Sequence, residues 1–405
     1  MNNIEDNSKY SCSGCGACAA VCPVNAIEYK LNENGFFQAF VNEDKCIHCG
    51  KCKRVCARFF EENKFGKSLE KGKVYSAQST NNDTIKKCTS GGIAYEISKY
   101  GIENGYKIIG TAYDYDNNMA NTIVVDKIEE LEKLRGSKYI QSNTANAYRS
   151  MLEICKNDKE SKFIVFGTPC QIAGVNKIQE VNNIKNEIIK IELFCHGVPS
   201  YLVWKNYLKF LKEKHGIDEI KDITFRNKDL SWHKYYMNIK SKNGNSYLNH
   251  SDKDIFYKAF LDNILLNTSC QTCEFRKKYS MADIRIGDYW GKRYSNREDG
   301  VSAILIMNDI GKELIENVEQ ENKIKIIEET SVSECINAQS IKDYQNQELR
   351  TKAFDELKNG KSLKKVIKNY RNKMPLKTRM RYFAKDVARL LPKKIKNKIK
   401  YIVKK

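Results

Sequence analysis

The chain has 405 residues, of which 41% are hydrophobic and 10% are aromatic, a composition typical of soluble globular proteins with more than one domain. It excludes collagen-like, mucin-like and small disulfide-stapled proteins. The sequence opens without a basic and apolar leader, and it contains no run of about eighteen uncharged apolar residues. We therefore expect a cytoplasmic protein that neither carries a signal peptide nor spans a membrane.

The formal net charge of +20 is unevenly distributed along the chain. Residues 361–405 contain 18 Lys and Arg and a single acid, Asp386, whereas the remainder is close to neutral. A nucleic-acid-binding domain would carry basic residues on its folded body, together with a recognisable motif. The sequence thus predicts no specific nucleic-acid partner, and it disfavours the hypothesis of a redox-sensing nucleic-acid-binding protein.

Eight of the 15 cysteines lie within the first 56 residues, in two runs that share the spacing C-x2-C-x2-C-x3-C. The first run is Cys12, Cys15, Cys18 and Cys22, and the second is Cys46, Cys49, Cys52 and Cys56. This spacing is typical of bacterial ferredoxins with two [4Fe-4S] clusters, in which the fourth cysteine of each run ligates the other cluster. It predicts one cluster on Cys12, Cys15, Cys18 and Cys56, and a second on Cys46, Cys49, Cys52 and Cys22. Zinc is the alternative, but its four ligands normally come as two separated pairs.

Beyond residue 62 the sequence changes from cysteine-rich loops to an alternation of strands and helices. Apolar runs of strand length, such as 107–110, 122–125 and 163–166, alternate with helix-period stretches such as 93–100. The pattern predicts an α+β ferredoxin-like dicluster module, then an α/β body, then a basic helical C-terminal tail. We place the module at 1–62, a linker at 63–73, the two parts of the body at 74–155 and 156–330, a helical segment at 331–360 and the tail at 361–405.

The tail combines its charge with an apolar stripe, because apolar residues from Leu376 to Ile402 recur three or four positions apart. Such a pattern is typical of helices that lie on an anionic membrane surface. Packing of the stripe against the body, with the charge merely solvated, is the alternative. We therefore expect either a peripheral contact with the inner face of the membrane or a fully cytosolic protein.

A candidate phosphate-binding turn, Ser90-Gly91-Gly92, precedes the helix-period stretch that begins at Ile93. Small residues at a helix start leave backbone N–H groups free to face an anion, which the helix dipole also favours. On its own the pattern is weak, because many capped helices begin with glycine. No G-x-G-x-x-G fingerprint follows a strand, so a dinucleotide would bind outside a Rossmann site.

Six further motifs follow in order along the body. They are RGSKYIQS at 135–142, GTPCQIAG at 167–174, CHGVPS at 195–200, FRNK at 225–228, CQTC at 270–273 and DIRIGDYWG at 283–291. In this order the motifs resemble those of the coenzyme F420 hydrogenase/dehydrogenase β-subunit family, in the form fused to an N-terminal dicluster ferredoxin. The resemblance extends from residue 1 to about residue 325.

The resemblance implies a flavin-binding body that holds FAD and passes electrons between an iron-sulfur cluster, the flavin and a two-electron partner. It implies that Ser90, Gly91 and Gly92 contact the pyrophosphate. It also implies that the flavin site is lined by Arg135, Ser137, Lys138, Tyr139 and Gln141. A flavin suits such a chain, because it accepts electrons singly from clusters and releases them in pairs.

Four cysteines of the body lie in these motifs, namely Cys170, Cys195, Cys270 and Cys273. Each follows strand-like sequence or lies in a loop, and four thiolates are the number that a [4Fe-4S] cluster requires. We therefore predict a third [4Fe-4S] cluster. The alternative is that Cys170 and Cys195 are small buried residues at strand ends, since free cysteine is among the most buried residue types.

His196 and His233 are the candidate catalytic residues, because a histidine can deliver the proton that accompanies a two-electron reduction near neutral pH. A hydrogen-bonded packing role is the alternative for each. Asp283 and Asp288 are candidate substrate ligands or turn caps, and Trp290 either stacks on a ring or fills the core.

The sequence therefore predicts a FAD- and [4Fe-4S]-dependent oxidoreductase whose substrate it does not identify. Electrons pass singly from the ferredoxin clusters to FAD and on to a two-electron acceptor, or in the reverse direction. The alternative is a non-catalytic electron-transfer subunit whose flavin serves a separate enzyme. The partner is accordingly a redox protein or a small-molecule substrate.

Overall fold

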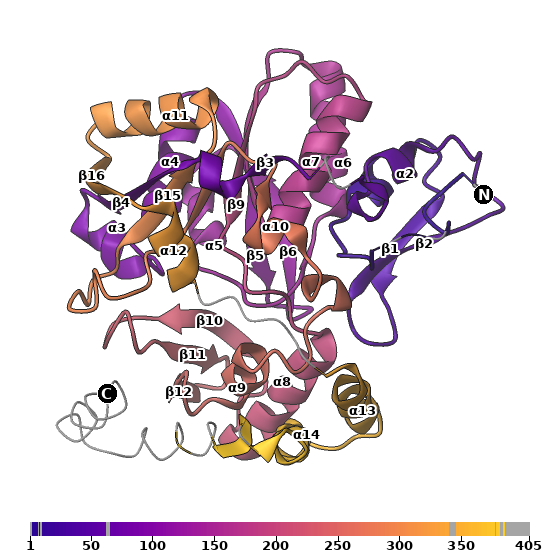
Figure 1. The fold of residues 1–405 in the computed structure, drawn as a ribbon, viewed down its shortest axis with the longest axis vertical. Coiled ribbons are helices and arrows are strands. Elements are labelled where there is room, and N and C mark those ends of the chain that lie inside the picture. Colours follow the sequence, from indigo (N-terminus) through magenta and orange to yellow (C-terminus); the bar gives the residue numbers. More distant parts are fainter. Residues whose placement is uncertain are drawn as a thin grey trace.

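The computed structural model describes residues 2–6, 8, 10–61, 65–339, 346–376, 378–380 and 384. It consists of a cysteine-rich module at the N-terminal end, a body built on a large sheet, and a smaller lobe of helices and strands (Figure 1). The module packs against one side of the body, and the lobe lies below the body in this view (Figure 1). No helix among the described residues is long and apolar enough to cross a membrane.

The cysteine-rich module is built from a hairpin and short helices. The hairpin pairs β1 (Ile27–Leu31) with β2 (Phe37–Val41), and the helices are α1 (Ala17–Ala20) and α2 (Lys51–Arg54). Gly16 and Gly50 precede the two helices with φ angles of 78° and 71°, a left-handed conformation that side chains disfavour. Each cysteine run can therefore bend sharply from its loop into its helix.

The segment expected to be a linker, 63–73, belongs to the fold from Phe65 onward, so that prediction is wrong for most of its length. Within it, β3 (Lys67–Ser68) pairs antiparallel with β13 (Tyr279–Ser280). The physical reason is burial, because Phe65 and Leu69 are only 4% and 1% exposed although their neighbours in sequence are charged. The module is thus joined to the body by packed chain.

The body is organised around a large sheet, nine-stranded within the described residues, in the order β16-β4-β15-β14-β9-β8-β5-β6-β7. Its strands are β4 (Lys73–Ser79), β5 (Tyr106–Asp114), β6 (Met119–Val125), β7 (Ser142–Asn143), β8 (Lys162–Gly167), β9 (Ile188–Leu193), β14 (Ile284–Asp288), β15 (Ser302–Ile306) and β16 (Ile324–Thr330). The central strands β14, β9, β8 and β5 are parallel, whereas β4, β15 and β16 pair antiparallel. The parallel centre confirms the α/β class predicted for the body.

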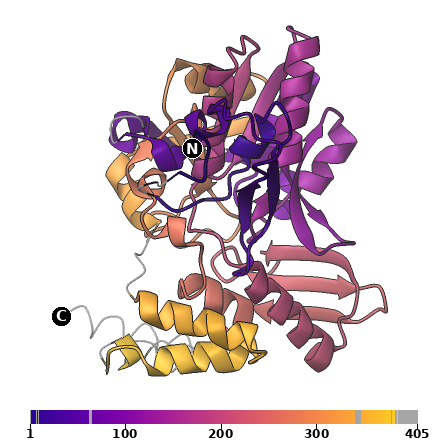
Figure 2. The same ribbon diagram turned by 90° about the vertical axis from the view of Figure 1, so that its right-hand side faces the viewer.

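Helices cover both faces of this sheet (Figure 2). They are α3 (Asn82–Lys87), α4 (Ile93–Glu103), α5 (Leu131–Leu134), α6 (Ala145–Asn157), α7 (Pro169–Val181), α11 (Asp309–Gln320) and α12 (Val332–Ala338). Short 3-10 turns also occur, at η1 (Ala57–Phe59), η3 (Leu69–Lys71) and η4 (Ile128–Glu130). Phe163 and Val165 of β8 pack with α6, α7 and the cysteine-rich module, whereas Ile164 packs with α4 and α11. Both faces of the strand are buried, which is why its sequence is a continuous apolar run.

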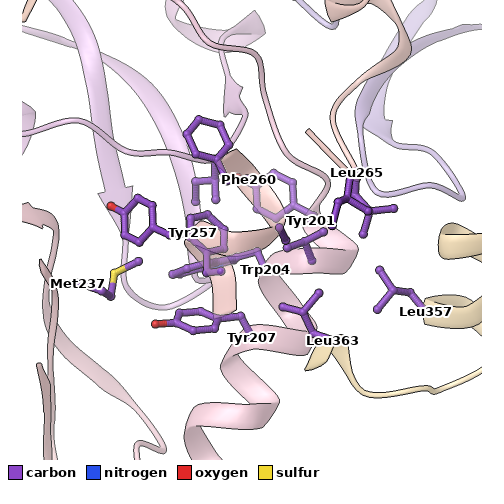
Figure 3. Packing of buried hydrophobic residues seen from close by; sticks show 14 of the residues in the cluster. Tyr201, Trp204, Tyr207, Met237, Tyr257, Phe260, Leu265, Leu357 and Leu363 are labelled. Atoms are coloured by element: carbon purple, nitrogen blue, oxygen red, sulfur yellow. The ribbon is translucent and has the colours of Figure 1, made fainter. Parts of the chain in front are cut away.

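The lobe is formed by the chain between β9 and β14 together with helices from the C-terminal region. Its elements are α8 (Tyr201–His215), β10 (Ile220–Asn227), β11 (Tyr236–Ser241), β12 (Ser246–His250), α9 (Ile255–Leu261), α13 (Gln347–Lys358) and α14 (Leu363–Asn372). Figure 3 shows Trp204 and Tyr257 at the centre of its core, with Leu357 of α13 and Leu363 of α14 closing one side. The lobe therefore lies within the expected second part of the body, 156–330, as an insertion between β9 and β14, and its core extends to helices beyond residue 330.

The first part of the expected tail, 361–405, belongs to this lobe. Val366 and Tyr370 of α14 are buried, at 0% and 4% exposure. Leu376 and Met380, which begin the apolar stripe, are 68% and 63% exposed. The remainder of the stripe lies outside the described residues.

Candidate iron-sulfur centres and cofactor site

The motifs that carry chemistry follow the carboxyl ends of neighbouring parallel strands. Cys170 comes after β8, Cys195 after β9, and Asp288 is the last residue of β14. The three strands are paired in register, with Gly167 opposite Glu192 and Ile286 opposite Leu193. Because the carboxyl ends of parallel strands meet at one edge of a sheet, these side chains gather there, as ligand-binding residues do in other open α/β sheets.

One cavity at this edge is lined by eight cysteines from both the module and the body. They are Cys12, Cys15, Cys18, Cys56, Cys170, Cys195, Cys270 and Cys273. Cys270 ends the 3-10 turn η5 (Thr268–Cys270), and Cys273 caps α10 (Glu274–Lys277). Gly197, in the loop after Cys195, has φ 126°, and a Cβ there would lie 2.8 Å from Leu266 Cδ1, so a side chain would not fit at this position. The structure therefore brings all four predicted body cysteines together, beside one ferredoxin quartet.

The other ferredoxin cysteines line a separate hollow at the surface of the module. They are Cys22, Cys46, Cys49 and Cys52. The twelve cysteines are thus partitioned between the hollow and the cavity in the grouping that the crossed ferredoxin spacing predicts. His48 lies beside the hollow, exposed, with its Nδ1 3.9 Å from Cys46 Sγ and its Nε2 3.6 Å from a carboxylate oxygen of Glu43.

Direct hydrogen bonds fix the module against the body. Thr144 Oγ1 donates to the carbonyl of Cys15 at 2.7 Å. Gln141 accepts from the backbone N–H of Phe37 at 2.8 Å and donates to the carbonyl of Ser13 at 3.2 Å. Both polar atoms of the Gln141 amide are therefore engaged by the module. This corrects the expectation that Gln141 lines the flavin site, because its amide instead holds the two parts of the chain together.

The cavity is chemically suited to an anionic metal cluster held by thiolates. Burial raises the pKa of Cys195 to about 11 and that of Cys273 to about 12, so both thiols stay protonated until metal binding displaces the proton. Arg276 lines the same cavity at 4% exposure and donates through Nη1 to the carbonyl of Cys270. Its Nε and Nη2 have no hydrogen-bond partner among the described residues. A buried cation whose N–H groups have no hydrogen-bond partner is stabilised by a nearby anion, which a thiolate-bound cluster would provide.

A second group of cations surrounds the start of α4, where Lys228 is buried and Arg135 is partly buried and pairs with Glu132 through Nη2. Lys228 Nζ donates to the carbonyls of Ser90 and Asp299, both at 2.6 Å. The guanidinium of Arg135 stacks 4.2 Å above the ring of Tyr95, and its Nε and Nη1 are buried with no hydrogen-bond partner among the described residues. Burial lowers the pKa of Lys228 to about 8. These cations fit a phosphate-bearing cofactor, whose oxygen atoms would accept hydrogen bonds from the unpartnered N–H groups of Arg135.

The Ser90-Gly91-Gly92 turn itself is packed against the sheet. The backbone N–H of Gly91 donates to Ser302 Oγ at 3.0 Å, and a Cβ on Gly91 would lie 2.7 Å from the carbonyl oxygen of Ala77. Gly92 has φ 87°, and a Cβ there would lie 2.8 Å from Thr84 Cγ2. Internal packing therefore accounts for both glycines, and the contact of this turn with a pyrophosphate stays a prediction.

The other residues predicted to line the flavin site separate into different surroundings. Lys138 Nζ donates to the carbonyls of Lys133 and Arg135 at the end of α5, and burial lowers its pKa to about 7. Tyr139 packs among aromatic rings of the lobe, with its ring centroid 5.3 Å from that of Phe260. Burial raises the pKa of Tyr139, and the nearby Ser137 side chain opposes that rise. Lys138 thus caps a helix, whereas Arg135 and Tyr139 remain available to a ligand.

An aromatic cluster that sequence reasoning did not assign to the site surrounds Arg226. This guanidinium lies 4.8 Å from the ring of Tyr235 and 4.7 Å from that of Trp290, and it pairs with Asp288. Asp288 also accepts from Trp232 Nε1 at 2.6 Å. The sequence signal for this cluster was the FRNK motif, in which Arg226 lies near the end of the partly buried strand β10 and Lys228 directly follows the strand.

The two candidate catalytic histidines lie at different positions. His196 follows Cys195 and packs its ring 5.0 Å from Phe260. His233 approaches the carbonyl of Tyr294 at 3.2 Å and lies against Trp232. Asp283 is structural, because its carboxylate accepts from the backbone N–H of Lys190 at 2.7 Å and from the side chain of Asn308 at 2.8 Å.

Family models match three stretches of the chain. The model described as coenzyme F420 hydrogenase/dehydrogenase, β subunit N-term, matches residues 74–149, and the model of its C terminus matches residues 160–332. A 4Fe-4S dicluster domain matches residues 11–58.

Named relatives are similar over most of this chain. The coenzyme F420-dependent sulfite reductase of Methanocaldococcus jannaschii is 28% identical over 338 residues, which are 81% of this chain and 49% of that protein. This chain therefore spans about half the length of that relative. A subunit of the F(420)H(2) dehydrogenase of Methanosarcina mazei is 25% identical over 331 residues, 77% of this chain and 84% of that protein. A chain of the F420-reducing [NiFe] hydrogenase complex from Methanosarcina barkeri shares 20% identity over 76% of this chain and 94% of its own, at a TM-score of 0.46, too low to carry a conclusion.

Proposed function

The chain belongs to the coenzyme F420 hydrogenase/dehydrogenase β-subunit family, in the form with an N-terminal 4Fe-4S dicluster domain, and from this premise we propose that it is an iron-sulfur flavoprotein oxidoreductase. The observation that carries the proposal is the cavity in which a ferredoxin quartet and the body quartet of cysteines face each other. A ferredoxin module alone needs no such neighbour. Four further thiols beside it support a redox group of the body, placed to exchange electrons with the module.

In this proposal three quartets of cysteines each hold a [4Fe-4S] cluster. The body quartet is Cys170, Cys195, Cys270 and Cys273. Arg276 offers N–H donors to the sulfur atoms of this quartet, and Thr168 Oγ1 lies 3.2 Å from Cys170 Sγ. Hydrogen bonds to cluster sulfur stabilise the negative charge that reduction adds.

The cations around α4 would hold the phosphates of FAD. Arg135 supplies its two idle donors, and Lys228 supplies a charge beside Ser90. Tyr139 and Trp290 are the aromatic rings next to Arg226 that a flavin ring could approach. A flavin bound there supplies the conversion between single electrons and electron pairs. His196 and His233 remain the proposed proton donors.

The two-electron partner in this proposal is a small organic redox carrier of the deazaflavin type. The names of the two relatives support this choice, because both include coenzyme F420 or its reduced form. A non-catalytic electron-transfer subunit is the second candidate. The second quartet favours it, because its Cys49 is exposed and such a group can serve a protein partner. A chain that turns over the carrier with an artificial reductant is an enzyme by itself, whereas a subunit needs its partner.

A peripheral contact with anionic membranes also stays a proposal. Leu376 and Met380 are exposed apolar residues at the start of the stripe, in a segment rich in Lys and Arg. An exposed apolar stripe next to basic residues is the composition that anionic lipid surfaces attract.

The proposed FAD site is tested by measuring FAD binding to two variants that each lack one positive charge. Arg135→Gln and Lys228→Gln should each raise the Kd for FAD about tenfold or more, because hydrogen bonds to charged groups contribute about 1.5–3 kcal/mol. Iron content should not change. Lys234→Gln, which removes a Lys outside this group, is the control.

The pH dependence of FAD binding adds a second readout. Anion binding requires protonated Lys228, whose pKa is lowered by burial to about 8, so affinity should fall as the pH rises above that value. The other charges that act on Lys228 are those of Cys88, Asp288, Arg226 and Asp299. Lys228→Gln should bind weakly with no such fall. Equal affinities in parent and variant at pH 7 would move the phosphate site elsewhere.

A further inference from the structure

Residues 2–6 form a segment, which we name the N-terminal strap, beside the second ferredoxin quartet. Asn2 and Asn3 of the strap line the surface hollow together with Cys22, Cys46, Cys49 and Cys52. Asn3 is buried, at 1% exposure, although its neighbour Asn2 is exposed. A polar side chain buried this deeply needs hydrogen-bond partners, and the partners of Asn3 connect it to the quartet.

The side-chain amide of Asn3 has partners at both its oxygen and its nitrogen. Its Oδ1 accepts from the backbone N–H of Glu5 at 2.8 Å. Its Nδ2 donates to a carboxylate oxygen of Glu43 at 2.8 Å and to Cys46 Sγ at 3.7 Å. An Asn amide nitrogen carries two hydrogens, so it serves both acceptors at once. Because the N–H of Glu5 requires an acceptor, the amide oxygen faces Glu5 and the nitrogen faces the sulfur.

The strap is held in place on both sides of Asn3. Before it, Asn2 Nδ2 donates to the carbonyl of His48 at 3.1 Å. After it, the carbonyl of Ile4 accepts from Arg58 Nη1 at 3.1 Å. The position of the Asn3 amide beside Cys46 is therefore fixed by contacts with residues that are not themselves cluster ligands.

The main chain of the strap lies near a second cysteine of the same quartet. Burial raises the pKa of Cys52, and the main chain of Ile4 opposes that rise. The side chain of Ile4, at 3% exposure, belongs to the same apolar cluster as Cys52 and Val55. The strap therefore approaches two of the four cysteines, Cys46 through a side chain and Cys52 through the main chain.

A hydrogen bond to a ligand sulfur changes the energy of a reduced cluster. Reduction adds one negative charge, which N–H donors to the sulfur atoms stabilise. The donor of Asn3 is buried, and a hydrogen bond is electrostatically stronger in such surroundings than in water. The side chain of Glu43 is 45% exposed, so solvent screens its opposing negative charge. The donor should therefore favour the reduced state of a cluster on this quartet.

We propose that Asn3 raises the reduction potential of the second ferredoxin cluster by donating a hydrogen bond to Cys46 Sγ. The inference rests on the proposed function in one respect, namely that this quartet holds a [4Fe-4S] cluster. In the step concerned a one-electron reductant loses one electron and the oxidised cluster gains it, and no bond forms or breaks. A higher potential lets this cluster, whose Cys49 is exposed, accept an electron from a weaker reductant.

The test is an anaerobic redox titration of the reconstituted full-length protein with dithionite, followed by electron paramagnetic resonance. Asn3→Leu keeps the size of the side chain and removes both N–H donors. It should lower the equilibrium constant for one-electron reduction of one cluster about tenfold, which corresponds to about 59 mV. Asn2→Leu is the matched control, because Asn2 lies in the same strap and donates to a backbone carbonyl instead of a sulfur. It should leave every potential unchanged.

Two further substitutions assign the shift to the bond between Asn3 and Cys46. Cys49→Ala, which removes a ligand of the second quartet, should abolish the titration component that shifts in Asn3→Leu. The shift should also persist when Asn3→Leu is made in a Glu43→Gln background, because the carboxylate is then absent from both chains compared. A shift in another component, or a shift that disappears with Glu43→Gln, would overturn the proposal.

Asn3→Asp keeps the test decisive if Asn3→Leu disturbs assembly of the cluster. It preserves the size and the acceptor for Glu5 and replaces the donors by a negative charge, so the potential should fall further than in Asn3→Leu. Loss of the second cluster from both variants would give Asn3 a purely structural role and overturn the proposal.

Iron content separates failure of this inference from failure of the proposed function. Equal potentials in parent, Asn3→Leu and Asn3→Asp, with the second cluster present, would overturn the role of Asn3 alone. As much iron in Cys49→Ala as in the parent would show that the second quartet holds no cluster, and the proposed function itself would then fail.

Discussion

Arg276 is a buried cation that lines the cavity of the body cysteines. Burial raises the pKa values of Cys195 and Cys273, and Arg276 opposes that shift at both thiols. It acts in the same sense on Cys270. A positive charge at this position should stabilise the extra negative charge of a reduced cluster and so raise its reduction potential.

We predict that Arg276→Gln lowers the reduction potential of the body cluster by about 60 mV or more, equivalent to a tenfold change in the equilibrium constant for one electron. An anaerobic redox titration followed by electron paramagnetic resonance measures it. The two ferredoxin clusters provide internal controls, because their potentials should not move. A body cluster whose potential is unchanged or higher in the variant would contradict this role of Arg276.

Residues were predictable from sequence where covalent spacing dictates chemistry. The grouping of the ferredoxin cysteines follows from intervals of two and three residues, which bring thiols together in any fold that bends there. Gln141 and Arg226 could not be assigned in this way, since their partners Phe37 and Asp288 lie far away in sequence. Gln141, for example, bonds to Phe37 and Ser13, more than a hundred positions earlier.

Gly92 shows how a motif can be explained by the fold alone. A glycine before a helix predicts a phosphate site or a left-handed cap equally well, and only the structure distinguishes the two. Because Gly92 has φ 87° and a Cβ there would lie 2.8 Å from Thr84 Cγ2, Gly92→Val is expected to destabilise the fold. It would therefore be a poor probe of cofactor binding.

At the scale of elements, buried strands were the most predictable features. β5, β6 and β8 contain the apolar runs of strand length, and each lies where the alternation indicates. The lobe was not predictable, because its core joins α8 and α9 to α13 and α14. Strands β14, β15 and β16 of the large sheet lie between these two pairs of helices in the sequence. The charged residues around Phe65 likewise concealed a buried segment. A local sequence pattern does not show which distant element packs on the apolar face of a helix or strand.

The boundary between lobe and tail predicts the outcome of two truncations. Deletion of 377–405 should leave the free energy of unfolding nearly unchanged. Deletion of 361–405 should lower it by at least about 3 kcal/mol, because α14 buries several large side chains worth about 1.5 kcal/mol or more each. They are Leu363, Val366, Ile367 and Tyr370. Urea denaturation of the two truncated chains measures the difference.

The shorter truncation also tests the proposed membrane contact. Residues 377–405 contain twelve Lys and Arg against Asp386 alone, and each basic residue near an anionic surface contributes about 1 kcal/mol. The full chain should co-sediment with anionic vesicles at low salt and be released at high salt, and the chain ending at 376 should not bind. Vesicle binding that survives the deletion would assign the contact to another surface.

At the scale of the whole molecule, the candidate redox sites occupy separate places in the fold. The hollow with Cys49 lies at the surface of the module, the shared cavity lies where module and body meet, and the cations of Arg135 and Lys228 lie around α4. Figure 2 shows the module in indigo packed directly against the body. Hydrogen bonds from Gln141 and Thr144 fix this interface, so the closeness of the ferredoxin and body cysteines is a property of the folded chain.

The central claim is that the body quartet holds a third cluster beside the ferredoxin pair. The most direct measurement is the iron and sulfide content of the anaerobically reconstituted chain. We predict about twelve of each per chain, at four per cluster, and about eight in Cys273→Ser. Cys155→Ser, which alters a buried cysteine that does not line the cavity, should retain about twelve. A parent with about eight iron atoms, or a Cys273→Ser variant with as many as the parent, would contradict the account.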